Sequence, residues 1–340
     1  MKLLIDVTHP AHVHFFKGAA RIWQEHGHQV RFVARDKEIT TQLLAEYSIP
    51  FQTLSKIRKG LLGLSVELVE HQTNLVKILR SYQPDMILNI GGTFIVHVGK
   101  LMGIKTCVFT DTEHAKLSNK ITFPFASYIC TPDCYTDDLG EKHNRYKGYQ
   151  ELAYLHPSQF SPNPKILSQL GLHEGERYFI LRFVSWGASH DVGKKGMSLN
   201  GKINLVESLK QHGRVLITSE GDLSRPLQPY RINVSPIHIH DLLFYSSMYI
   251  GEGATMASEA AILGTPSVYA SPLELGYLHE LNDKYQLMYH YRDGDAAVDK
   301  ILSLAKDPEL KHKHQKRLQR MLNEKIDVTA WIVNFIESFK

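Results

Sequence analysis

The sequence has few cysteines, a small net charge and no long apolar run, and each shortage excludes a class of protein. Its three cysteines (Cys107, Cys130 and Cys134) form neither an even set nor a CxxC pair. A disulfide framework and a zinc ribbon are therefore excluded, and we expect reduced thiols. The 39 basic and 35 acidic residues leave a formal net charge of +4, far from the concentrated positive charge of a nucleic-acid binder.

No apolar run reaches the roughly 18 residues of a membrane-spanning helix. The apolar start at residues 3–5 is interrupted by Asp6, which is unlike an export signal. We therefore expect a cytoplasmic protein whose approach to lipid is peripheral contact with the inner face of the cell membrane. The basic and leucine-rich stretch from Arg58 to Leu64 suits contact with anionic headgroups, although leucines that follow a glycine also begin core helices.

Apolar runs alternate with amphipathic stretches along the whole chain, which indicates parallel sheets covered by helices on both faces. A single core stops growing near about 250–300 residues, so we predict two domains, 1–157 and 165–340, separated by a proline-rich break. The final helix either stays with the second domain or returns to the first. The predicted strands are residues 2–7, 29–34, 51–54, 85–90, 105–110, 128–131, 178–183, 214–218, 248–250 and 267–269. The predicted helices include residues 13–26, 37–47, 65–81, 199–212, 241–245 and 255–263.

The densest chemical signal is the segment Gly251-Glu-Gly-Ala-Thr255, which follows a predicted strand and opens a helix. Small residues let the backbone approach a phosphate closely, and the free N–H groups of the helix start stabilise its charge. Glu259 falls about one turn inside the helix, where a carboxylate accepts hydrogen bonds from ribose hydroxyls. The alternative is a tight strand-to-helix turn with an exposed glutamate.

The pattern Gly-x-Gly-Ala-x-x-x-x-Glu-Ala-Ala-x-x-Gly-x-Pro, residues 251–266, resembles the donor-binding motif of GT-B glycosyltransferases and of the non-hydrolysing UDP-GlcNAc 2-epimerases. Two stretches of the first half, residues 89–93 and 110–120, resemble the peptidoglycan UDP-GlcNAc transferase. The opening at residues 6–17 is similar to a bacterial and archaeal family of GT-B-like proteins. One feature departs from the transferase: Thr8-His-Pro-Ala-His12 replaces its glycine-rich first loop.

The resemblance implies an α/β, GT-B-like fold, in which two doubly wound Rossmann-like domains face each other across a cleft. The N-terminal domain would hold the acceptor and the C-terminal domain the nucleotide-sugar donor. The segment from His238 to Leu243 would wrap the base. The nucleotide-binding residues expected on this basis are Arg182, Ser185, Gly187, Ser219, His238, Ile239, Gly253, Ala254, Thr255, Met256 and Glu259. The expected acceptor residues are His9, Gly92, Thr93 and Asn119.

Three residues at strand ends of the first half are candidate catalytic groups. A transfer needs a base for the acceptor hydroxyl, and the pKa of a histidine, ordinarily about 6.5, suits His12 to this task. Asp111 and Glu113 follow the fifth predicted strand. One of them would either orient His12 by a hydrogen bond or act as the base itself. The alternative for Asp111 is that it only caps the turn that follows. Arg182, if not merely structural, or Lys194 and Lys195 would stabilise the departing diphosphate.

Two other sequence patterns resemble those of metal-binding sites and of catalytic triads. His9, His12 and His14 are similar to the His-x-His pair of metal hydrolases, but such sites need further ligands from the later strands of one barrel. We therefore expect no metal. The contiguous Ser189-His190-Asp191 cannot form a catalytic triad, whose members come from separate segments, and its loop is expected to line the donor phosphates.

These observations predict a metal-independent glycosyltransferase with no cofactor besides its UDP-sugar substrate. It would act on a cell-surface glycan or a lipid-linked acceptor, as in polysaccharide biosynthesis. A UDP-sugar 2-epimerase or hydrolase on the same fold, and a non-catalytic nucleotide-sugar-binding subunit, remain as alternatives.

Overall fold

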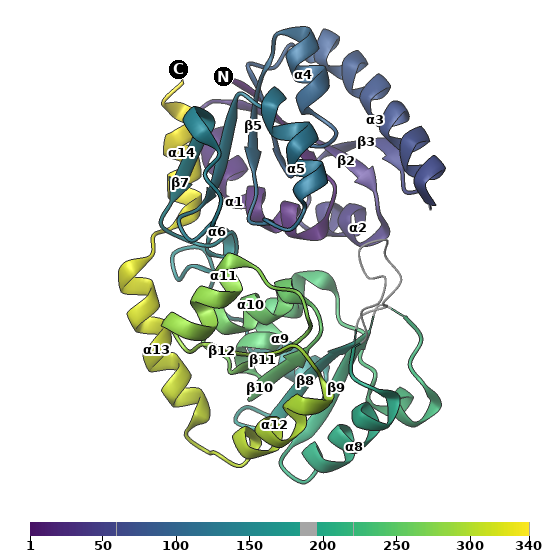
Figure 1. The fold of residues 1–340 in the computed structure, drawn as a ribbon, viewed down its shortest axis with the longest axis vertical. Helices are drawn as coiled ribbons and strands as arrows, with labels where there is room; N and C mark the ends of the chain where they lie inside the picture. Colours follow the sequence, from purple (N-terminus) through teal and green to yellow (C-terminus); the bar gives the residue numbers. More distant parts are fainter. Residues whose placement is uncertain (59, 184–195, 220, 340) are drawn as a thin grey trace. The chain divides into compact units, whose positions relative to one another are not determined.

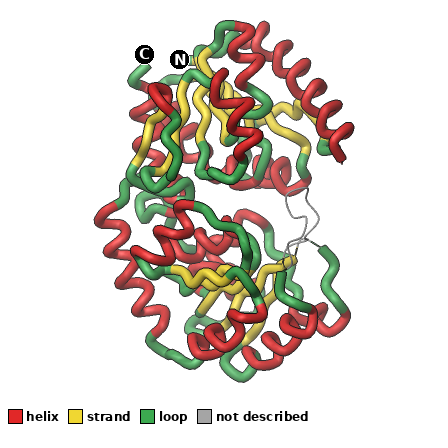
Figure 2. The backbone as a smooth tube through the Cα atoms, in the orientation of Figure 1, coloured by secondary structure: helices red, strands yellow, loops and turns green. Residues whose placement is uncertain are grey.

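The chain divides into two compact units, which are described separately below. A computed structural model describes residues 1–58, 60–183, 196–219 and 221–339. Met1–Gln159 and Ile326–Lys340 form the first unit, and Phe160–Lys325 form the second. Within each unit a layer of strands is flanked by helices (Figures 1 and 2). None of the described helices is long and apolar enough to cross a membrane.

The first unit contains a parallel sheet with the strand order β3-β2-β1-β4-β5-β6-β7. The order reverses between β1 and β4, and the carboxyl ends of strands at such a point are where open α/β sheets bind ligands. The strands of this sheet are β1 (Lys2–Val7), β2 (Gln29–Asp36), β3 (Phe51–Lys56), β4 (Met86–Ile90), β5 (Lys105–Phe109), β6 (Tyr128–Pro132) and β7 (His143–Tyr146).

The helices of the first unit cover the sheet and include the last helix of the chain. Helix α14 packs against α1 and α6, and Thr329 Oγ1 on α14 donates to the carbonyl of Ala153 at 2.6 Å. The final helix therefore belongs to the first unit, the second of the two placements that the sequence allows. The helices are α1 (Pro10–Glu25), α2 (Glu38–Glu46), α3 (Gly60–Tyr82), α4 (Val96–Met102), α5 (Lys116–Thr122), α6 (Leu152–Leu155) and α14 (Val328–Glu337).

The second unit contains a five-stranded parallel sheet with the order β12-β11-β10-β8-β9, which reverses between β8 and β10. Its central strands β8, β10 and β11 are almost wholly buried because helices cover both faces, as in β8, whose sequence is YFILRF. The strands are β8 (Tyr178–Phe183), β9 (Arg214–Ser219), β10 (Met248–Gly251), β11 (Ser267–Ala270) and β12 (Met288–Tyr291). The helices are α7 (Lys165–Gln169), α8 (Leu199–Leu209), α9 (Ile239–Tyr245), α10 (Ala254–Ile262), α11 (Gly276–His279), α12 (Val298–Ala305) and α13 (Leu310–Glu324).

The sequence missed one edge strand in each sheet and placed the starts of α1 and α3 too late. Strands β7 (HNRY) and β12 (MYHY) are short, and each buries a single residue fully, so neither shows an apolar run. Helix α1 begins at Pro10 instead of residue 13, and helix α3 begins at Gly60 instead of residue 65. The early apolar side chains of α3 are exposed, with Leu62 85% and Leu64 47% accessible. These two leucines therefore begin a helix that reaches the core only through later residues such as Leu75 and Leu79.

Candidate functional site

The carboxyl edge of the second sheet brings the predicted donor residues together where the strand order reverses. Arg182 at the end of β8 is the register partner of Gly251 at the end of β10. The amide of Glu252 donates to the carbonyl of Arg182 at 3.3 Å. The backbone thus turns from β10 into α10 directly beside the end of β8, at the position where doubly wound sheets bind ligands.

Among the described residues, no side-chain hydrogen bond caps the first turn of α10. Its N-cap, Gly253, is extended and provides no side-chain hydrogen bond. The first amides of a helix have no partner within the helix, and here they belong to Ala254, Thr255 and Met256, which are partly or fully exposed. Such a helix start binds phosphate through its N–H groups and its dipole.

The start of α8, which follows β8 in the chain, is by contrast already occupied by side chains. The hydroxyl of Ser198 accepts the amide of Gly201 at 3.0 Å, and Asp295 Oδ1 accepts the amide of Ser198 at 3.2 Å. An added phosphate would meet the negative charge of Asp295 there. Of these two helix starts, the one preceded by the predicted motif is therefore the one suited to a diphosphate.

Glu259 is buried and paired, which excludes the interpretation of an exposed turn glutamate. Its side chain is only 4% exposed, and its Oε1 lies 3.0 Å from Nε2 of the buried His240. His240 belongs to α9, which packs against α10 and begins at Ile239 with His238 as its N-cap. The contact between the two helices thus places the predicted base-binding segment beside the predicted ribose ligand.

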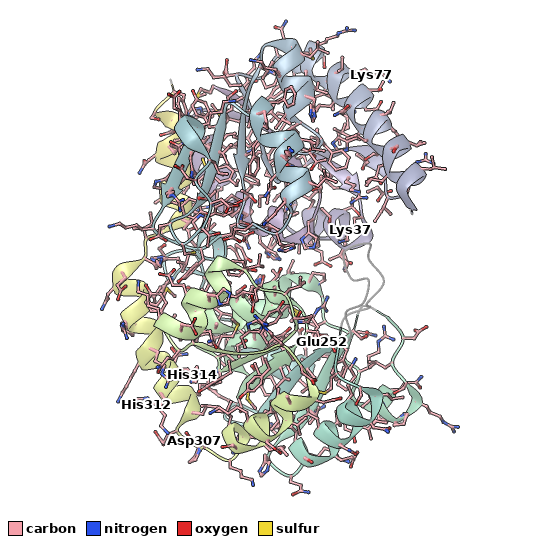
Figure 3. The ribbon with its side chains drawn as sticks, in the orientation of Figure 1. Lys37, Lys77, Glu252, Asp307, His312 and His314 are labelled. Carbon is pink, nitrogen blue, oxygen red and sulfur yellow. The ribbon has the colours of Figure 1, made fainter. Side chains whose placement is uncertain are left out.

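Glu252 is a feature of this edge that the sequence analysis passed over, although it lies inside the motif. Its Oε1 accepts the amide of Met197 at 2.9 Å and lies 3.4 Å from Nζ of Lys202. Figure 3 labels Glu252 at this edge of the sheet. The carboxylate therefore ties the segment that leads into α8 to the turn between β10 and α10. Ser219 lies at the end of β9, whereas Ser185, Gly187, Ser189, His190, Asp191, Lys194 and Lys195 lie outside the described residues.

Gly251 has a steric reason to be glycine. A Cβ atom there would lie 2.1 Å from the hydroxyl oxygen of Tyr249. That hydroxyl is buried and has no hydrogen-bond partner among the described residues. Burial raises the pKa of Tyr249, which keeps the hydroxyl protonated. The close approach lets the turn lie flat over the tyrosine.

The carboxyl edge of the first sheet carries His9 and His12, and backbone amides fix the roles of both rings. The amide of Thr8 donates to His12 Nδ1 at 3.3 Å, and the amide of Ala11 donates to His9 Nδ1 at 3.2 Å. A neutral imidazole that accepts through Nδ1 carries its proton on Nε2. In this state the His12 ring is a hydrogen-bond donor at Nε2, whereas a general base needs an unprotonated Nε2.

Burial and the positive charges of His9 and Lys37 hold the pKa of His12 well below its usual range. His12 is therefore neutral at physiological pH. His14, the third histidine of this stretch, stacks on Tyr154 with ring centroids 5.2 Å apart, and its Nδ1 lies 3.3 Å from the Tyr47 hydroxyl. Nδ1 of His12 and Nδ1 of His14 thus contact different partners.

Asp111 follows β5 and has the perturbed pKa expected of a proton-transfer group. Burial raises its pKa to about 6, the charge of Glu113 adds to the shift, and a hydrogen bond from the Thr112 hydroxyl opposes it. The amide of Thr112 donates instead to Thr110 Oγ1 at 3.2 Å, so the Thr110 hydroxyl supports this turn. A carboxylate with a pKa near the working pH is an effective general base.

Of the predicted acceptor residues, Gly92 and Thr93 follow β4, Asn119 lies in α5 after β5, and His9 is the N-cap of α1. Asn89 Oδ1 accepts the amide of Gly92 at 2.7 Å, and the hydroxyls of Thr93 and Ser118 are 3.1 Å apart. Asn119 donates through Nδ2 to the carbonyl of Thr112 at 3.0 Å. A cavity of about 600 Å³ lies beside these groups. Its polar lining residues include Glu113, Lys116, Asn119, Tyr135 and Asp137.

Comparison with known proteins assigns this architecture to the GT-B class. A UDP-GlcNAc 2-epimerase from Neisseria meningitidis bound to UDP-GlcNAc has a TM-score of 0.71 at 12% identity, covering 99% of this chain and 100% of that chain. The Streptomyces sp. SF2575 glycosyltransferase SsfS6, complexed with thymidine diphosphate, has a TM-score of 0.64 at 12% identity, covering 99% of each chain. The predicted fold class, two Rossmann-like α/β domains of GT-B type, is therefore confirmed.

The chain belongs to the family described as "Protein of unknown function (DUF354)", which it matches over residues 1–337. The Uncharacterized protein MJ0665 of Methanocaldococcus jannaschii is 22% identical over 316 residues, which cover 89% of this chain and 90% of that protein. The family match thus extends from the opening at residues 6–17 along almost the whole chain.

Proposed function

We propose that the protein is a metal-independent glycosyltransferase that moves a sugar from a UDP-sugar to a cell-surface glycan or a lipid-linked acceptor. The observation that carries the proposal is the uncapped first turn of α10, with the buried Glu259 behind it. The diphosphate would bind the amides of Ala254 to Met256. Glu259 would accept the ribose hydroxyls, and the backbone at Ile239 would contact the base.

His240 supports this assignment because it orients Glu259. A carboxylate that is buried and bonded on one oxygen to His240 Nε2 at 3.0 Å has a fixed direction, and an oriented group loses little entropy on binding a ligand. Arg182, one register position from the turn, would add positive charge toward the departing diphosphate.

For the base we assign Asp111 in preference to His12. The pKa of Asp111 is raised to about 6, so it is ionised at neutral pH and accepts a proton readily. His12 accepts the Thr8 amide at Nδ1, so its outer nitrogen donates. Glu113, whose charge acts on Asp111, would keep the pKa of Asp111 raised and would line the acceptor cavity.

A lipid-linked acceptor fits the surface of the first unit. Leu62, Val66 and Val69 lie on one face of α3 at helical spacing, each more than half exposed, and Lys56 and Arg58 precede them. Exposed apolar side chains beside cations suit the boundary of an anionic bilayer.

A 2-epimerase is the second candidate, favoured by the similarity to the Neisseria enzyme bound to UDP-GlcNAc. Asp111 and Glu113 would then move protons on the sugar of the donor itself. The two functions differ in what they require: an epimerase or hydrolase changes the UDP-sugar without a second substrate, whereas a transferase needs an acceptor. A binding subunit changes nothing in either case.

The first test is calorimetric titration with UDP, GDP, dTDP and CMP. We expect selective binding of UDP, weakened by roughly 1–3 kcal/mol in Glu259→Ala through loss of the ribose hydrogen bonds. Glu207→Ala is the matched control, because Glu207 is an exposed carboxylate of the same unit paired with Lys210. Equal affinity in Glu259→Ala and wild type would remove Glu259 from the site, and absence of nucleotide binding would end the proposal. Incubation with UDP-sugars, with and without glycan acceptors, then separates the candidate reactions.

A further inference from the structure

A carboxylate lies inside the turn that leads into α10. Glu252 stands between Gly251, the last residue of β10, and Gly253, the N-cap of α10. Its side chain is only 2% exposed, and its Oε1 accepts the amide of Met197 at 2.9 Å. A buried negative charge repels a nearby phosphate strongly, because little water screens the two charges. The turn proposed to hold the diphosphate therefore contains a group that opposes the binding of an anion.

Lys202 supplies the opposite charge. It lies in the first turn of α8, and its Nζ is 3.4 Å from Glu252 Oε1. The same Nζ lies 4.5 Å from the centroid of the ring of Phe183, the last residue of β8, and a cation is attracted to the face of an aromatic ring. The ring and the carboxylate together hold the ammonium at the carboxyl edge of the second sheet, where Figure 3 labels Glu252.

A purely structural tie between these segments would not need either charge. The Met197 amide would donate equally well to the side-chain oxygen of a glutamine, which also accepts hydrogen bonds. A buried ion pair is often no more stabilising than neutral groups that fill the same space. What the two charges change is the electric field at the neighbouring turn, because Lys202 cancels the charge that Glu252 would otherwise present to the amides at the start of α10.

We propose that Lys202 is a positioning residue of the anion site at α10, where it compensates the charge of Glu252 and thereby allows a diphosphate to bind. Lys202 acts through Glu252 and needs no contact of its own with the ligand. The identity of the ligand as a nucleoside diphosphate rests on the proposed function, whereas the compensation applies to any anion bound by this turn. The dependence of affinity on Lys202 should therefore grow with the negative charge of the ligand.

The test is calorimetric titration of the full-length protein with UMP, UDP and inorganic pyrophosphate. Lys202→Met removes the charge and keeps a long side chain against Phe183. The variant should lose at least about tenfold in affinity for UDP, because the carboxylate then repels the diphosphate without compensation, and it should lose less for UMP. Lys210→Met is the matched control, since Lys210 at the far end of α8 forms a similar pair with Glu207 at 3.1 Å. The control should bind all three ligands like wild type.

A second substitution separates charge compensation from a structural role. Lys202→Met combined with Glu252→Gln removes both charges and keeps an oxygen that accepts the Met197 amide, so it should recover most of the lost UDP affinity. Glu252→Gln alone should bind UDP more tightly than wild type, and it gives the answer if Lys202→Met does not fold. Equal losses for UMP and UDP in Lys202→Met, no recovery in the double variant, or weaker UDP binding by Glu252→Gln would each overturn the proposal.

The same titrations separate the compensation from the proposed function. Protein that binds pyrophosphate but not UDP, and depends on Lys202 to do so, refutes the nucleotide site and keeps the compensation. Equal UDP affinity in wild type and Lys202→Met keeps the nucleotide site and refutes the compensation. Protein that binds neither ligand refutes both.

Discussion

The two sheets of the molecule end in edges of different chemical character. The edge of the second sheet presents backbone amides at the open start of α10, with Glu259 fixed behind them by His240. The edge of the first sheet presents side chains, among them His12 and Asp111, whose pKa values are shifted by burial and by neighbouring charges. Backbone amides hold a charge without titrating, whereas groups with shifted pKa values exchange protons.

This difference suggests that the second unit binds the nucleotide and that the first unit carries out the chemistry. An edge built of backbone amides and a proposed ribose ligand is suited to binding a nucleotide, because backbone amides do not change charge with pH. An edge with a carboxyl group of pKa about 6 is suited to chemistry. The division predicts that substitutions in the second unit change affinity for UDP, and that substitutions at Asp111 change the rate.

The largest effect is expected from Asp111→Asn. The variant should lose roughly 10²–10⁴-fold in kcat with an acceptor, because the general base is removed, while its affinity for UDP stays that of wild type. Wild-type kcat should fall as the pH drops below about 6, where Asp111 becomes protonated. Steady-state rates between pH 5 and pH 8, beside calorimetry with UDP, measure both quantities.

Asp138→Asn is the control for this substitution, since Asp138 is an exposed carboxylate on a loop of the same unit, where it accepts the amide of Gly140. It should retain the wild-type rate. An Asp111→Asn enzyme with undiminished kcat would assign the proton transfer to another group. A loss of UDP affinity in Asp111→Asn would instead contradict the assignment of nucleotide binding to the second unit and of chemistry to the first.

A smaller effect is expected from Gly251→Ala, which tests the packing under the nucleotide turn. The new Cβ would lie 2.1 Å from the Tyr249 hydroxyl oxygen, so the turn or the buried ring must move, and such overpacking costs about 1–3 kcal/mol. Urea unfolding should show this loss of stability, and the displaced turn should bind UDP more weakly. Adding Tyr249→Phe to Gly251→Ala should restore part of the stability and part of the UDP affinity, because it removes the hydroxyl. Alone, Tyr249→Phe should not destabilise the protein, since that hydroxyl has no hydrogen-bond partner among the described residues. Equal stability of Gly251→Ala and wild type would mean that this approach is not tight.

The sequence predicted the fold and the turn from β10 into α10 better than it predicted the contacts of individual side chains. Buried parallel strands such as β8 are continuous apolar runs, and the Gly251 to Thr255 pattern follows one of them, so both are visible without coordinates. The pairing of Glu259 with His240 joins two residues 19 positions apart in the chain, on different helices, and no local pattern encodes it. Whether His12 donates a hydrogen bond through Nε2 depends on the direction of the backbone amide of Thr8. Only the folded turn shows this direction.

The smallest effect is expected on stability, and it concerns Asp111 again. Because burial raises the pKa of Asp111 from 3.8 to about 6, the folded protein binds this proton more tightly than the unfolded chain. The stabilising contribution is complete below the unfolded pKa, near 4, and is lost as the pH rises through about 6. At pH 8 the ionised carboxylate therefore destabilises the fold. Asp111→Asn should be more stable than wild type at this pH by up to about 2 kcal/mol, somewhat less than the raised pKa of Asp111 implies. Urea midpoints of the two proteins at pH 8 and pH 4 measure this difference, which should shrink at the lower pH. A variant that is less stable than wild type at pH 8 would show that the carboxylate is held by favourable contacts, and Asp111 would then belong with the structural groups and not with the chemistry of this edge.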